Sequence, residues 1–148
     1  MAQGDAKLFR DFALKSNQGD YSDADTSSIA FLSDTYSAVD IEATNPQLSG
    51  FTVTSGGNIS AVTNLAGYTF TRATTTITFD ATDPSTFPKN ASNTADVRSL
   101  LVYNNTSTNY DAYQVFDLTS DGTTPLDLVN NDLVFNFGAS GITTATTS

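Results

Sequence analysis

Residues 97–118 read VRSLLVYNNTSTNYDAYQVFDL, in which two apolar runs are separated by a polar segment. The runs at residues 100–103 and 113–116 are rich in the β-branched and aromatic side chains that suit a pleated, half-buried surface. Residues 104–109 between them are all Asn, Thr or Ser, whose short polar side chains favour turns. This stretch therefore predicts a central β-hairpin around which the rest of the chain is organised.

Further strand patterns lie on both sides of the hairpin. Pro46 cannot donate to a sheet ladder, so residues 36–50 are predicted to form a long surface loop. Many short strands separated by turn signals predict an all-β, mainly antiparallel fold, a β-sandwich or barrel of about eight strands. The strand candidates are residues 29–32, 51–54 and 133–137, and two strands within residues 68–80 joined by a bend at 73–75.

The N-terminal segment is the one candidate for a helix. Within residues 5–16, apolar side chains recur at three- and four-residue spacing among charged ones, which is the pattern of a short amphipathic helix. We therefore divide the chain into an N-terminal arm or helix at residues 1–16 and a single β domain at residues 17–148. The arm either packs on its own domain or reaches a neighbouring subunit, and the second alternative predicts that deleting it leaves a folded monomer.

The charge balance of the chain limits the classes of partner. The 16 acidic and 6 basic residues give a formal net charge of −10, which repels a polyanion, so nucleic acid is not expected as the main partner. No apolar run reaches the length of a membrane helix, and the first residues lack the pattern of a signal peptide. We expect a protein that is made and folded in the cytosol and does not bind a membrane.

The residue types present leave little catalytic chemistry. The chain has no histidine and no cysteine, which excludes Ser-His-Asp, Cys-His and His-metal arrangements. A carboxylate pair such as Asp80 and Asp117 is the remaining candidate for glycoside hydrolysis, but the chain has no tryptophan on which a sugar ring could stack. We expect no enzyme activity, no catalytic residue and no cofactor.

One acidic loop has the residue types of a cation site. Asp20, Asp23 and Asp25 could offer carboxylate oxygens to calcium, yet the glycine turn and distal glutamate of an EF-hand are missing. We predict a solvated acidic loop without a metal, and these three residues are the candidates if an ion were bound.

Candidate contacts to a partner come from the N-terminal arm, if it reaches a neighbouring subunit, and from tyrosines that are predicted to lie at the surface. Tyrosines combine an apolar ring with a polar hydroxyl, so the predicted exposed ones could anchor an interface or a sugar ring. The alternative is that most of them cap the core. The tyrosines concerned are Tyr21, Tyr36, Tyr110 and Tyr113. The predicted partner or subunit contacts are Leu8, Phe9, Arg10, Phe12, Leu14, Tyr36 and Tyr110.

The hairpin and the segments after it resemble a family of small structural proteins from tailed bacteriophages. Members commonly carry an apolar run ending in Tyr-Asn-Asp-Thr, a strand of the form apolar-apolar-Asp-apolar, an alternating strand and a closing Gly-Ile. This chain departs from the pattern at Asn105, where an acidic residue is usual, and at residues 68–80, which replace a Trp-bearing strand. The matching residues are 98–106, 113–118, 131–137 and 141–142, with an upstream echo at 29–36.

The resemblance implies a virion component. By itself it does not separate a capsid component from a tail or neck component, but the acidic charge suits an exterior position away from packaged DNA. We therefore expect a capsid decoration, or cement, protein that binds the major capsid protein on the outside of the shell and stabilises it. We expect a homo-oligomer, with a trimer preferred. The alternative from a different class is a tail, neck or fibre component, which includes a receptor- or glycan-binding module.

Overall fold

The computed structural model describes residues 3–73, 76–137 and 142–146. In this part of the chain eight strands form a five-stranded and a three-stranded sheet, and every strand pair is antiparallel. The predicted all-β, mainly antiparallel fold with one short helix near the N-terminus is thereby confirmed. Neither sheet closes into a barrel in the described residues, and no helix there is long and apolar enough to cross a membrane.

The larger sheet contains the predicted central hairpin. Its strands lie in the order β1 (Ala6–Leu8), β7 (Ala112–Asp117), β6 (Ser99–Asn104), β2 (Ser27–Leu32) and β3 (Thr63–Asn64). Every residue of β2, β6 and β7 is buried. Because successive side chains of a strand point to opposite faces, this burial means that both faces of the large sheet are covered.

The smaller sheet confirms the predicted strand pair within residues 68–80. It contains β4 (Thr69–Arg72), β5 (Thr76–Asp80) and β8 (Thr143–Thr146), with β5 in the centre. Part of the predicted bend, residues 74 and 75, lies outside the described residues.

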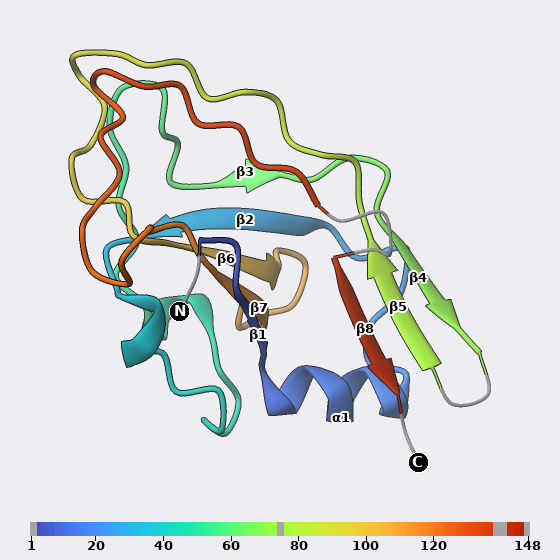
Figure 1. The fold of residues 1–148 in the computed structure, drawn as a ribbon. Helices are drawn as coiled ribbons and strands as arrows, with labels where there is room; N and C mark the ends of the chain where they lie inside the picture. Colours follow the sequence, from blue (N-terminus) through green and yellow to red (C-terminus); the bar gives the residue numbers. More distant parts are fainter. Residues whose placement is uncertain (1–2, 74–75, 138–141, 147–148) are drawn as a thin grey trace.

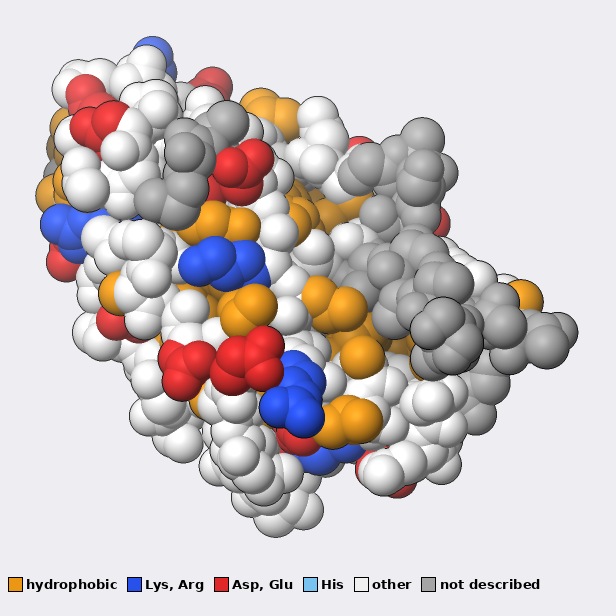
Figure 2. Space-filling model, turned by 60° about the horizontal axis from the view of Figure 1, so that its bottom comes forward, with side chains coloured by type: hydrophobic (Ala, Val, Ile, Leu, Met, Phe, Trp, Pro, Cys, Tyr) orange, Lys and Arg blue, Asp and Glu red, His pale blue; other side chains and the backbone are white. Residues whose placement is uncertain are grey.

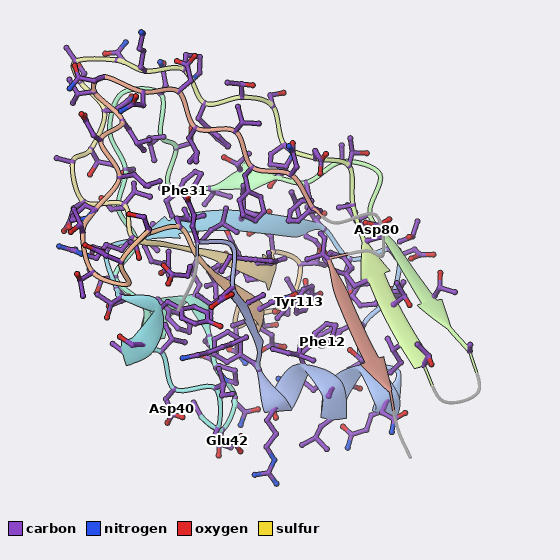
Figure 3. All side chains as sticks on the ribbon, in the orientation of Figure 1. Phe12, Phe31, Asp40, Glu42, Asp80 and Tyr113 are labelled. Carbon is purple, nitrogen blue, oxygen red and sulfur yellow. The ribbon has the colours of Figure 1, made fainter. Side chains whose placement is uncertain are left out.

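The helix and the small sheet cover one face of the large sheet (Figure 1). Helix α1 (Arg10–Gln18) contributes Phe12, and the small sheet contributes Phe70 and Phe79. The centres of these three rings lie 4.8, 5.9 and 5.5 Å from the ring centre of Tyr113 on β7. Figure 3 shows Phe12 and Tyr113 on this side of the sheet and Phe31 on the other. Tyr113 is therefore the centre of an aromatic core that joins all three elements.

Long irregular segments cover the opposite face of the large sheet, at the top of Figure 1. There the Phe31 ring packs edge-on against Phe87 at 5.0 Å, and Phe116 packs edge-on against Phe135 at 5.1 Å. The predicted strands at residues 51–54 and 133–137 are wrong, because these segments form only isolated bridges. Alternate side chains of these segments lie on the sheet and cover it. Burial therefore alternates along the segment as in a strand, although the backbone does not pair in a ladder.

The N-terminal segment is part of the same core. The predicted helix start at residue 5 is wrong, because residues 6–8 form β1 and pair with β7 before α1 begins. Phe9 and Phe12 are fully buried, and the Phe9 N–H donates to the Tyr113 carbonyl at 3.1 Å. Of the two alternatives for this segment, the structure shows the one in which it packs on its own domain.

Helix α1 ends where the sequence offers a glycine. Gly19 has a φ of 87°, a left-handed conformation that costs glycine little. The N–H of Gly19 donates to the Ser16 carbonyl and the N–H of Asp20 donates to the Lys15 carbonyl, which satisfies two carbonyls of the last turn.

Candidate partner-binding surface

Three segments lie side by side at one end of the molecule: α1, the loop of residues 34–51 and the turn of residues 105–111 between β6 and β7. The loop and the turn both contain exposed polar and apolar side chains, as the helix does. We call this region the α1 surface and define it by the exposed side chains of Arg10, Leu14, Glu42, Asn45 and Tyr110.

Backbone hydrogen bonds hold the three segments of the α1 surface together. The Arg10 N–H donates to the Ile41 carbonyl at 3.1 Å, which ties the start of the helix to the loop. The Leu48 N–H donates to the Tyr110 carbonyl at 3.0 Å, which ties the loop to the turn. The predicted surface loop is thus confirmed, and it is anchored at its middle as well as at its ends.

A lysine links the helix to the turn by ion pairs. The Lys15 Nζ lies 3.3 Å from an Asp11 oxygen and 3.1 Å from an Asp111 oxygen, and the Lys15 and Asp111 side chains are only 20% and 12% exposed. Burial alone would lower the pKa of Lys15, but the hydrogen bonds to Asp111 and Asp11 and their negative charges outweigh it, so the pKa is raised. Lys15 therefore stays charged and holds α1 against the hairpin.

Replacing Lys15 by methionine is expected to lower the free energy of unfolding by about 1–3 kcal/mol, because Asp111 then loses its partner in a largely buried position. Denaturant unfolding measures the change. The matched control is Arg10→Met, which removes the same charge from an exposed pair with Glu42 and is expected to cost less than about 0.5 kcal/mol. Equal losses in the two variants would contradict the role assigned to Lys15.

Tyr110 occupies an unusual backbone conformation on this surface. Its φ is 55°, although a left-handed conformation costs a non-glycine residue roughly 1–2 kcal/mol. Its side chain is 46% exposed, with the ring edge-on to Tyr103 at 6.3 Å. Asn45, nearby in the loop, is the other described non-glycine residue with a positive φ. The fold thus holds an exposed aromatic ring at a position where a small residue would fit with less strain.

The structure separates the predicted contact residues into two groups. Phe9, Phe12 and Tyr36 are buried within the chain and Leu8 is half-buried, because β1 and α1 contribute to the core. Arg10, Leu14 and Tyr110 are exposed, and all three lie on the α1 surface. Of the two alternatives for the four tyrosines, the structure confirms that most of them belong to the core, because three of the rings fill the space around β7 and the start of the loop. These are Tyr21, Tyr36 and Tyr113.

Tyr36, which was expected to be exposed, is buried because a lysine side chain lies over its ring. The Lys7 Nζ lies 4.3 Å from the centre of the Tyr36 ring and donates to the Tyr36 carbonyl at 3.0 Å, so the lysine covers it. Burial and the nearby charges of Asp5 and Asp117 raise the pKa of Tyr36. A lysine ammonium placed over an aromatic ring is attracted to the ring face and shields that face from solvent.

The acidic loop uses two of its carboxylates within the chain. The Phe70 N–H donates to Asp23, which ties the loop to β4, and the Ser22 N–H donates to Asp25 at 3.0 Å, which closes a turn. In the described residues no group of three or more acidic side chains could hold a metal ion. The predicted metal candidates Asp20, Asp23 and Asp25 are thus not brought together as a cluster.

The two carboxylates considered for hydrolysis belong to different sheets. Asp80, labelled in Figure 3, is exposed at the end of β5. Asp117 is fully buried on β7. One Asp117 oxygen accepts hydrogen bonds from the Thr119 N–H and hydroxyl at 2.9 and 2.6 Å. Asp117 therefore has a structural role in closing the turn after β7, and the pair does not face a shared open cleft.

Sequence reasoning missed a cavity beside the α1 surface. The loop of residues 34–51 curves around a space of about 390 Å³. The apolar lining includes Val39, Pro46 and Phe51, and the acidic lining is Asp34 and Asp40. The only sequence signal was the length of the predicted surface loop, which does not say whether the loop encloses a space.

The α1 surface has the mixed character of a reversible contact. In Figure 2, which brings the side with α1 forward, hydrophobic side chains lie in patches interrupted by acidic and basic groups. Such a mixture is typical of non-obligate interfaces, which are about as apolar as the rest of a protein surface. No family model, no curated protein and no solved structure matches this chain. The assignment of function therefore depends on the residues and their geometry.

Proposed function

We propose that this protein is a capsid decoration, or cement, protein of a tailed bacteriophage, which binds the major capsid protein on the outside of the shell and stabilises it. The class of protein is suggested by the resemblance of residues 98–106, 113–118 and 131–137 to phage structural proteins. The observation that carries a binding role is Tyr110, an exposed aromatic side chain held at a φ of 55° in the turn whose Asp111 pairs with Lys15 of α1, the helix that carries the exposed Arg10 and Leu14. Aromatic side chains and arginine are the usual anchors of protein interfaces.

The net charge of −10 fits a position outside the shell, away from packaged nucleic acid. Modest contacts suffice there, because many copies held in register on a lattice reinforce one another as linked sites do. A homo-oligomer, with a trimer preferred, is part of the proposal. The N-terminal segment gives no support to an oligomer, because its own domain covers it. The surface that a contact between subunits would cover is then the one with the exposed Thr69 and Thr71 on β4.

The test is to mix the purified protein with expanded phage capsids that lack tails, pellet the shells and measure the bound copies per coat subunit. Saturable binding at a copy number comparable to that of the coat protein is expected. Binding at only a few copies would place the protein at the neck or tail. An absence of binding would favour the receptor- or glycan-binding alternative.

Replacing Tyr110 by asparagine is expected to weaken binding to these capsids about 30-fold, the effect of losing an aromatic anchor of about 2 kcal/mol. The free energy of unfolding should stay within about 1 kcal/mol of wild type, because asparagine accepts a positive φ and this gain offsets the lost contact with Tyr103. Capsid pelleting over a range of protein concentrations measures the affinity.

The matched control for Tyr110 is Val134→Asn. Val134 is 58% exposed, and it lies in the loop layer that covers the other face of the large sheet. Its replacement is expected to leave capsid binding unchanged. If the two variants bound equally well, Tyr110 would not be a contact residue.

A further inference from the structure

We infer that the cavity of the 34–51 loop receives an extended basic side chain, a lysine or an arginine, from the coat protein partner. This inference rests on the proposed function and deepens it, because it states the chemistry by which the partner is recognised.

The cavity is built into the fold. At the neck of the loop, the Ser33 N–H donates to the Thr52 carbonyl at 3.0 Å and the Thr52 N–H donates to Asp34 at 2.6 Å. The Ala112 N–H donates to the Pro46 carbonyl at 2.9 Å, which fixes the far side of the loop on β7. A preformed cavity of about 390 Å³ lies within the size range of sites for small ligands and side chains.

The walls of the cavity suit the stem of a long side chain. Val39 and Pro46 are buried, and the half-buried Phe51 ring packs edge-on against Phe9 at 5.7 Å, so these apolar walls are held in place by the core. Lysine and arginine bury their aliphatic stems on surfaces of this kind and keep the charged head near water.

The charges of the cavity select the head group. Its lining residues include Asp34 and Asp40 and no lysine or arginine. Both Asp34 oxygens accept hydrogen bonds from Thr52, at 2.6 and 3.2 Å, so its negative charge is fixed in the wall. Asp40 is exposed, and Figure 3 shows it with Glu42 on the outer side of the loop. An anionic occupant would be repelled, and a purely apolar one would desolvate carboxylates without compensation.

The surroundings make Asp40 the carboxylate that meets the partner. Glu42 already pairs with Arg10 at 3.4 Å, whereas Asp40, whose Oδ1 accepts a hydrogen bond from the Glu42 N–H at 3.0 Å, has no ion pair in the described part of the chain. A protein with a net charge of −10 attracts a basic partner over a distance, and a basic side chain that enters this cavity meets Asp40 first.

The test uses a probe that needs no capsid. The isotope-labelled full chain is titrated with Nα-acetyl-arginine amide and, separately, with the uncharged Nα-acetyl-norleucine amide, while backbone amide shifts are followed by NMR. The arginine probe is expected to shift the amides of residues 38–50 and to saturate at millimolar concentration. Asp40→Asn is expected to weaken this binding about fivefold. The control Asp80→Asn, an exposed carboxylate on β5, should leave it unchanged.

Equal shifts with the two probes, or shifts that spread over the acidic surface without saturation, would overturn the inference. The capsid assay separates it from the proposed function. If wild type and Asp40→Asn bind capsids equally, the inference fails and the proposed function stands. If the arginine probe saturates but wild type binds no capsids, the assignment of the basic side chain to a coat protein fails.

Discussion

Replacing Phe12 by alanine is expected to remove about 3–5 kcal/mol from the free energy of unfolding. The Phe12 ring is fully buried, and its centre lies 4.8 Å from that of Tyr113, 5.7 Å from that of Tyr21 and 6.2 Å from that of Phe70. Its loss opens a space where the helix, the small sheet and the large sheet meet. The surrounding rings come from separate elements whose backbones are fixed, so they can fill that space only in part.

The matched control for Phe12 is Leu14→Ala, which removes an apolar side chain from the same helix at a position that is 51% exposed. Its cost is expected to stay below about 0.5 kcal/mol, since alanine is also the better helix former. Chemical denaturation followed by circular dichroism measures both values. Similar small losses in the two variants would mean that α1 does not pack on its own domain.

Stability is expected to fall steeply above about pH 10, the ordinary pKa of tyrosine. Burial raises the pKa of Tyr21 and Tyr113, and the charge of Asp111 raises both further. Burial also raises the pKa of Tyr36 and Tyr103. The folded chain therefore keeps these protons at a pH where the unfolded chain has released them. The stabilisation is complete below about pH 10 and is lost as the pH rises towards the folded-state values.

The slope of this loss can be stated. Each tyrosine that stays protonated only in the folded state costs about 1.4 kcal/mol per pH unit above pH 10, so Tyr21 and Tyr113 together cost about 2.8 kcal/mol per unit. Phenolate absorbance and circular dichroism, recorded together against pH, should change in one cooperative step. Tyr113→Phe removes one of these groups and should make the fall shallower. Gradual ionisation of all tyrosines in a chain that stays folded would contradict the prediction.

Local patterns were sufficient to predict the two strand pairs that are close in sequence. Residues 97–118 and 68–80 each contain both partners of a hairpin, so alternation and turn residues point to the same structure. The pattern failed at residues 133–137, where Leu133 and Phe135 are buried and Val134 is exposed as in a strand, but within the described residues this segment forms only an isolated bridge between Leu133 and Phe87. The alternation of apolar residues shows which side chains are buried. Whether the segment pairs as a strand depends on other segments that are distant in the sequence.

The sequence predicted some of the exposed residues of the candidate site but not its cavity. The residue types of Arg10, Leu14 and Tyr110 marked them as possible contacts, and they are exposed together on the α1 surface. The same reasoning selected Phe9 and Phe12, because an amphipathic helix shows which face is apolar but not whether its own domain or a partner covers that face. The cavity was not predicted, since it depends on hydrogen bonds between segments far apart in the sequence.

The pairing of β1 with β7 determines when this protein can fold during its synthesis. Residues 6–8 reach their partners at residues 114–116 only after more than two thirds of the chain has been translated and has left the ribosome. Until then residues 6–8 have no strand partner and the Phe9 N–H lacks the Tyr113 carbonyl, although Phe12 can already contact Tyr21 and Phe70. The large sheet can therefore be completed only once β7 has left the ribosome, and such long-range pairing favours slow folding.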